Sequence, residues 1–186
     1  MLWVTPYPAL MGLPLAEAFG DVLAYNICLL LSFPLSGLAT YLLCLYLTRN
    51  RLAAFIGGLI FAFFPNRLSH ATSHFAQVIT FWFPLYALYL IKLARRPSAR
   101  TALLTGVLLA FSLLVNIVHT AYFVAPFTAL FLLFSAISRR DKIAPQLAIP
   151  FLLAGILTGP FLVPFAISSL KGKLSYMEIP GTVSYA

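Results

Sequence analysis

Charged side chains are scarce in this sequence. Only 9% of its 186 residues are charged, and only four residues are acidic. Soluble domains carry about 25% charged residues, so this chain cannot cover a surface that faces water. Hydrophobic residues instead make up 62% of the chain, and its mean hydropathy is +0.98. These values indicate an integral membrane protein.

The alternation of polar and apolar residues that is typical of a membrane barrel is missing, which leaves helices as the spanning elements. A helix crosses a bilayer with about 20 apolar residues. We therefore predict an all-α, polytopic transmembrane helix bundle with six crossings. The apolar runs that define them are 22–48, 52–66, 75–94, 101–118, 121–138 and 144–170.

Cysteine is also rare, and the spacing of the two cysteines excludes a disulfide between them if both lie in one helix. Cys28 and Cys44 share the first apolar run, where a helix separates them by about 24 Å. A disulfide tolerates at most about 7 Å between its Cα atoms. Both are predicted to be free thiols.

Basic residues are distributed unevenly over the loops. Two follow the first run, four follow the third and three follow the fifth, which puts nine of the 12 on one side of the bundle. The positive-inside rule makes this side cytoplasmic and both termini extracytoplasmic. We expect one membrane-embedded domain over 1–186, in which an outer loop tail at 1–21 precedes the bundle at 22–170 and an outer tail at 171–186 follows it.

The first residues have no basic segment followed by an apolar core, so they are not a signal peptide. An N-terminus outside the membrane then needs a preceding helix. We expect the chain to be part of a longer protein whose N-terminal segment is its partner.

A polar stripe follows the second run. Arg67, His70, His74 and Gln77 are spaced by three, four and three residues, which puts them on one face if the segment is helical. His119 lies in a hairpin predicted on the same outer side. The stripe could anchor helix ends at the interface, bind a phosphate through guanidinium and imidazole donors, or bind a divalent metal through His70 and His74.

Carboxylates limit the possible catalysis. Glu17 and Asp21 precede the first crossing, and they could cap it or line a site. Lys171 and Lys173 could anchor the last helix or provide a second phosphate contact. The short basic loops lack the aromatic-laced basic surface of a nucleic-acid-binding protein, so nucleic acid is not an expected partner.

Three stretches carry a family resemblance: "GLPLAEAFGDVLAYN", "LIFAFFPNRLSHATSHFAQVITFWFPLYALYLIKLARRPS" and "NIVHTAYF". They resemble bacterial GT-C-type polytopic membrane glycosyltransferases, and most closely those related to dolichyl-phosphate-mannose and arabinose transferases. The resemblance covers most of residues 12–170. It implies a multi-pass protein of the bacterial plasma membrane.

The resemblance also implies an activity. Such enzymes transfer a sugar from a polyprenyl-phosphate donor to an acceptor at the extracytoplasmic face, and an acidic residue in their first outer loop acts as base or holds a metal. Glu17 and Asp21 lie in the corresponding tail, and the family's first helix precedes it, so the chain could be an inactive fragment. Arg67, His70 and His74 would bind or orient the lipid phosphate or share a metal.

Two other classes of function remain open on the sequence alone. Transporters place ionisable residues inside the bundle, whereas here they map to boundaries. A non-catalytic multi-pass protein would use the stripe only as an anchor.

Overall fold

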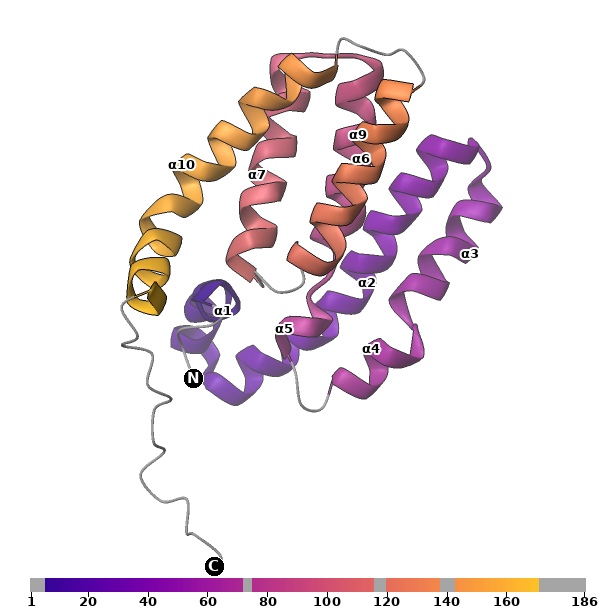
Figure 1. The fold of residues 1–186 in the computed structure, drawn as a ribbon. Coiled ribbons are helices and arrows are strands. Elements are labelled where there is room, and N and C mark those ends of the chain that lie inside the picture. Colours follow the sequence, from indigo (N-terminus) through magenta and orange to yellow (C-terminus); the bar gives the residue numbers. More distant parts are fainter. Residues whose placement is uncertain (1–5, 72–74, 116–119, 138–142, 171–186) are drawn as a thin grey trace, which may run out of the picture.

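The computed structural model describes residues 6–71, 75–115, 120–137 and 143–170. These residues form an all-α protein, which confirms the predicted class (Figure 1). The elements are α1 (Pro6–Phe19), α2 (Asp21–Thr48), α3 (Arg51–Ala62), α4 (Pro65–His70), α5 (Phe75–Val78), α6 (Trp82–Arg95), α7 (Ala99–Val115), the π-helix η1 (Thr120–Val124), α9 (Ala125–Ile137) and α10 (Ile143–Leu170).

The helices pack side by side in an order that differs from their order in the chain. α2 pairs with α3 and α6, α6 pairs with α7, and α10 packs along α7 (Figure 1). The core lies where α6, α7 and α10 meet, and it includes Trp82, Tyr86, Leu90, Leu109 and Ala154. Most large apolar side chains outside this core remain exposed, as a surface that faces lipid requires.

The α2–α3 hairpin depends on close backbone contact. The side chain of Asn50 caps α3 by accepting from the backbone N–H groups of Leu52 and Ala53, at 2.9 and 3.1 Å. Farther along the pair, a Cβ on Gly58 would lie 2.7 Å from the carbonyl oxygen of Gly37. Glycine is therefore required for the two helices to approach this closely.

α10 approaches α7 in a comparable way, but not at Gly155 and Gly159. These two glycines have the spacing of a helix-packing motif, yet a Cβ on either would meet nothing within 4 Å in the described part of the chain. The close contact is at Gly106, where a Cβ would lie 3.0 Å from Pro150.

The predicted second crossing is broken between α3 and α4. α3 ends at Ala62 and α4 begins at Pro65, whose ring fits the first turn of a helix. By length and composition, Asp21–Thr48 and Arg51–His70 could each cross a membrane. The shorter apolar segments are Ala99–Val115, Thr120–Ser135 and Ala148–Pro160, so the full set of six crossings stays a prediction.

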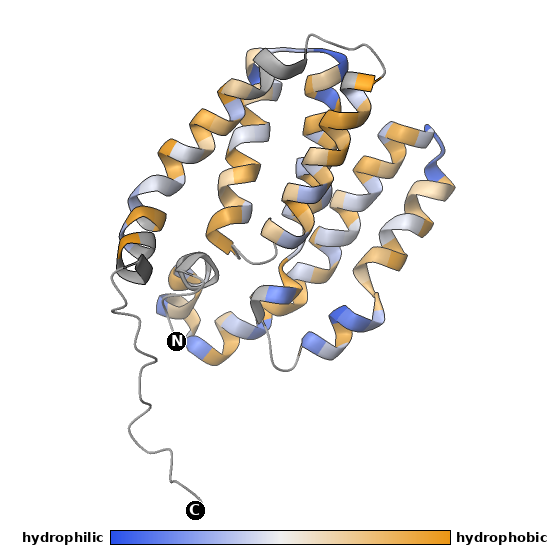
Figure 2. Ribbon diagram, in the orientation of Figure 1, coloured by the Kyte–Doolittle hydropathy of each residue, from blue (hydrophilic) through white to orange (hydrophobic). Residues whose placement is uncertain are grey.

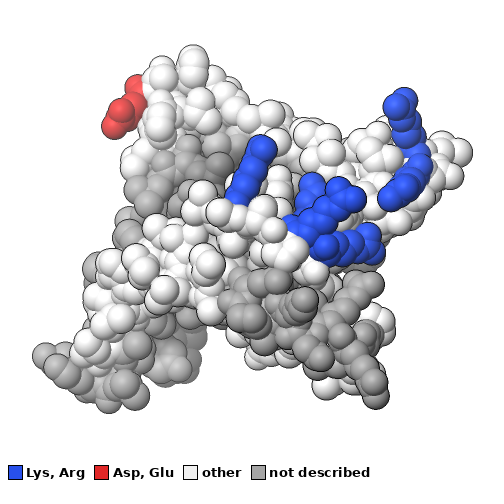
Figure 3. All heavy atoms as spheres, turned by 90° about the horizontal axis from the view of Figure 1, so that it is seen from above, with Lys and Arg blue, Asp and Glu red and all other residues white. Residues whose placement is uncertain are grey.

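The two ends of the bundle are more polar than its middle (Figure 2), and they differ in charge (Figure 3). Hydrophilic residues concentrate at both ends of the helices, and hydrophobic residues dominate between them (Figure 2). The turns after α2 and after α6 lie at one end, and there the Lys and Arg side chains gather on a single face (Figure 3). At the other end, the segment predicted as the tail of an outer loop contains α1.

Candidate functional site

A cavity of about 520 Å³ lies between α2, the α3–α4 segment and the start of α6. We call it the groove. Its lining is mainly apolar, and Ile60, Phe64 and Phe123 are more than half exposed where it reaches the surface. Its polar lining residues are Thr40, Asn66, Arg67, His70, Gln77 and Thr80.

Arg67 is the charged residue of this lining, and it is only 6% exposed. Its Nε and Nη2 groups donate to the carbonyl oxygen of Val78 at 3.1 and 2.6 Å. Nη2 also donates to the carbonyl oxygen of Ser32 at 2.8 Å, and Nη1 donates to that of Ala62 at 3.4 Å. The side chain therefore joins α2, α3 and α5.

Helix breaks explain why a guanidinium fits this position. α3 ends at Ala62 and α5 ends at Val78, so carbonyl groups near both ends lack the partner that a longer helix would provide. In an apolar setting such groups need another donor. Arg67 supplies several in one planar unit, and its guanidinium carbon lies 4.9 Å from the centre of the Phe33 ring.

These contacts satisfy the hydrogen bonds of Arg67 without neutralising its charge. Its partners are carbonyl oxygens, the hydroxyl of Ser32 and the Phe33 ring, and none of these described contacts is a carboxylate. A buried cation is costly unless it is paired. The groove therefore has a fixed positive charge in its wall.

The polar stripe is only partly as predicted. Arg67, His70 and Gln77 do line one cavity, but the expected single helix is not present. α4 ends at His70 with Ala71 as its C-cap, and Gln77 belongs to α5. His74, His119, Lys171 and Lys173 lie outside the described residues, so their expected roles stay predictions.

The two candidate carboxylates are not brought to the groove. Glu17 on α1 and Asp21 at the start of α2 are both exposed, and neither belongs to the groove lining. On α2, Asp21 precedes Ser32 by about 16 Å of helix. The described residues also contain no group of three or more His, Cys, Asp or Glu side chains that could hold a metal ion.

Thr40 and Thr80 are lining residues that the sequence analysis missed. Thr40 is buried on α2, and its Oγ1 has no hydrogen-bond partner among the residues that the structure describes. Thr80 lies just before α6, where its hydroxyl is 3.5 Å from that of Ser36. Both lie within apolar runs, and a threonine there is an ordinary helix or interface residue, so the sequence carries no signal for them.

Comparison with known families identifies the chain at a coarse level. Residues 3–184 match the family described as "6-pyruvoyl-tetrahydropterin synthase related domain; membrane protein". The chain belongs to this family. Its members are membrane proteins, which confirms the class expected from composition. No curated protein and no solved structure matches this member of the 6-pyruvoyl-tetrahydropterin synthase related family.

Proposed function

We propose that this chain is the membrane-embedded part of a GT-C-type glycosyltransferase of the bacterial plasma membrane, and that its groove binds a polyprenyl-phosphate sugar donor. The enzyme would transfer the sugar to an acceptor at the extracytoplasmic face. The observation that carries this proposal is the combination, in one groove, of apolar walls and a buried, uncompensated arginine.

The groove matches the two parts of such a donor. A polyprenyl chain is long and apolar, and Ile60, Phe61, Phe64 and Phe83 offer it an apolar wall. The rim of this wall is exposed, so a lipid could enter from the side of the bundle. A phosphate needs polar donors, and the groove has these where α4 and α5 contribute Asn66, His70 and Gln77.

The charge of the groove favours an anion. Arg67 sits in the wall with its donors directed to backbone carbonyls, so it would act on a bound phosphate mainly through its field. That field is strong in a site of low dielectric constant. In the transfer step, the leaving lipid phosphate gains negative charge, and a fixed cation stabilises it without reorganising.

Under this proposal, His70 and Gln77 are the direct contacts to the phosphate, and Arg67 holds the groove open and positive. Glu17 and Asp21 keep their predicted role as candidates for the catalytic base, although neither lines the groove in this structure. A divalent metal bound through His70 and His74 remains part of the expectation from sequence.

The direct test is photo-crosslinking of the purified chain with a diazirine-bearing polyprenyl phosphate. We expect labelled peptides from α3 and α6, and a reduction of labelling of about tenfold in the His70→Ala, Gln77→Ala double variant, which removes two contacts to a charged group. Tyr122→Ala is the matched control, because Tyr122 is 73% exposed and adjoins the groove residue Phe123 without lining the groove.

Catalysis is tested separately in membranes that contain the full-length protein. Release of labelled sugar from polyprenyl phosphate should fall in the same double variant and persist in Tyr122→Ala. Equal labelling of the double variant and the wild type would refute lipid-phosphate binding in the groove. Labelling without any sugar transfer would instead leave a lipid-binding protein and refute the transferase.

A further inference from the structure

A second cavity lies at the opposite end of the bundle from the polar end of the groove. It measures about 690 Å³ and is enclosed by the ends of α2 and α6 and the start of α7. Such a volume is in the range of about 300–1,000 Å³ that is usual for ligand sites. Its basic lining residues are Arg49, Lys92, Arg95 and Arg96. We call it the basic pocket.

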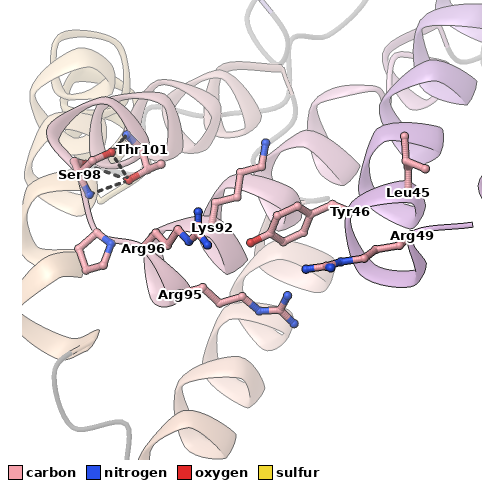
Figure 4. A pocket seen from close by; sticks show the side chains of 9 residues that line it. Leu45, Tyr46, Arg49, Lys92, Arg95, Arg96, Ser98 and Thr101 are labelled. Carbon is pink, nitrogen blue, oxygen red and sulfur yellow. Dashed lines mark hydrogen bonds between the residues drawn. The ribbon is translucent and has the colours of Figure 1, made fainter.

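The basic side chains are arranged around an aromatic ring. Tyr46 belongs to α2, and both the Lys92 ammonium and the Arg95 guanidinium carbon, from α6, lie 5.4 Å from the centre of its ring. Lys92 also lies 4.9 Å from the centre of the Tyr89 ring. Arg49 reaches toward the same gap from the end of α2 (Figure 4). Cation–π contacts therefore hold the charges of Lys92 and Arg95 close to each other.

This concentration of positive charge has no described acidic partner. Among the described residues the acids are Glu17 and Asp21, and the 28-residue helix α2 separates Asp21 from Arg49 by about 42 Å. Four like charges around one cavity repel one another unless an anion joins them. The two other acidic residues of the chain, Asp141 and Glu178, lie outside the described residues.

The start of α7 adds to the positive electrostatic potential of the basic pocket. Ser98 and Thr101 cap each other: the Ser98 N–H donates to Thr101 Oγ1 at 3.0 Å, and the Thr101 N–H donates to Ser98 Oγ at 3.2 Å. Both residues line the basic pocket, so the N-terminal end of this 17-residue helix faces it (Figure 4). The positive end of a helix dipole favours an anion there.

The position of the pocket indicates the kind of anion. It lies at the boundary between the apolar helices and the basic turns, which is the level of the lipid headgroups, and Leu45 and Pro97 give it an apolar side. Apolar side chains on the adjoining helices, such as Leu47 and Leu103, are about half exposed and available to acyl chains.

We propose that the basic pocket binds the phosphate headgroup of an anionic phospholipid in the leaflet at this end of the bundle, which the positive-inside rule makes the cytoplasmic leaflet. The phosphate lies between Arg49 and Arg95, Lys92 and Arg96 flank it, and the acyl chains lie against α2 and α7. This site is separate from the groove, and it does not depend on the proposed transferase activity.

The test measures binding of short-chain phosphatidylglycerol to the purified full chain in neutral detergent by native mass spectrometry. Phosphatidylcholine serves as the zwitterionic comparison. We expect the Arg49→Gln, Arg95→Gln double variant to bind phosphatidylglycerol about tenfold or more weakly, since two charge-assisted contacts are lost. Both side chains are exposed, so the variant is expected to fold.

The matched control is the Arg51→Gln, Arg100→Gln double variant. It has the same net charge and removes exposed basic residues from the same end, but neither residue lines the basic pocket. Its affinity should stay within about threefold of the wild type if the pocket, rather than net charge, binds the lipid. An equal loss of affinity in the two double variants would overturn the proposal.

Two further measurements distinguish the phospholipid from other possible occupants of the basic pocket. Inorganic phosphate alone should bind far more weakly than phosphatidylglycerol, and comparable binding would show that the occupant is a free anion. Asp141→Asn should leave lipid binding unchanged. If that variant instead bound phosphatidylglycerol about tenfold more tightly, Asp141 would be the natural partner of the cluster and the proposal would be wrong.

Discussion

Replacing Arg67 with methionine measures how much this one side chain contributes to the free energy of unfolding of the bundle. Methionine keeps an unbranched, apolar side chain at the position but removes every donor. The carbonyl of Val78, which accepts from both Nε and Nη2, loses these partners at the end of α5. The carbonyl of Ser32 keeps one, because it also accepts from the hydroxyl of Ser36 at 2.7 Å.

The expected magnitude follows from these contacts. A hydrogen bond to a charged group contributes about 1.5–3 kcal/mol, and an orphaned buried carbonyl costs about 1–3 kcal/mol. The two short contacts of Nη2, at 2.6 and 2.8 Å, dominate, while the 3.4 Å contact to Ala62 adds little. Removing a cation that has no described carboxylate partner offsets part of this loss. We expect the free energy of unfolding to fall by about 2–4 kcal/mol.

Unfolding in mixed micelles, titrated with SDS and followed by far-ultraviolet circular dichroism, measures this loss. Arg51→Met is the matched control, because Arg51 is exposed and should change stability by less than about 0.5 kcal/mol. Arg67→Lys separates charge from geometry: it keeps the cation but loses the planar fork, so it should recover only part of the stability. Equal stabilities of Arg67→Met and Arg51→Met would refute the assigned role.

Two other contacts give sharper local predictions. Gly58→Ala should destabilise the α2–α3 pair by about 1–3 kcal/mol in the same titration, because its Cβ would lie 2.7 Å from the carbonyl oxygen of Gly37. Gly155→Ala should be tolerated, because its Cβ would meet no described atom within 4 Å. Tyr86→Phe should cost about 1 kcal/mol, since it removes the buried 2.8 Å hydrogen bond between the hydroxyls of Tyr86 and Thr128. A neutral Gly58→Ala or Tyr86→Phe would show that the corresponding contact does not contribute.

The sequence predicts the class of the fold well because hydrophobicity alone determines it. The all-α class and the membrane class are both confirmed, and Arg51–His70 has the length of a crossing even though α3 breaks before Pro65. Helix contacts are harder to predict. The Gly155 and Gly159 spacing favours a close approach that the described residues do not show. Gly58 provides one instead, and the four-residue spacing of Ala54, Gly58 and Ala62 is a sequence signal for it that the predictions did not use.

Part of the groove lining is predictable from the sequence, but the contacts of these residues are not. The spacing of Arg67 and His70 correctly indicates that they lie together, and Gln77 joins them through a separate helix. The partners of Arg67 are mostly backbone carbonyls, which no residue pattern reveals. The sequence prediction treated the stripe as one continuous helix. It therefore missed the helix ends at Ala62 and Val78, whose carbonyl groups accept hydrogen bonds from Arg67.

The contacts of Arg67 also constrain the order in which the protein can assemble. Its carbonyl partners lie 35 residues earlier, at Ser32, and 11 residues later, at Val78. Once α2, α3 and α4 have been inserted, Arg67 can donate to Ser32 and Ala62, but its bonds to Val78 cannot form until α5 has been synthesised. An arginine with unsatisfied donors is costly inside the membrane, so we expect the second crossing to stay beside the translocon, or in contact with water, until α5 has been synthesised.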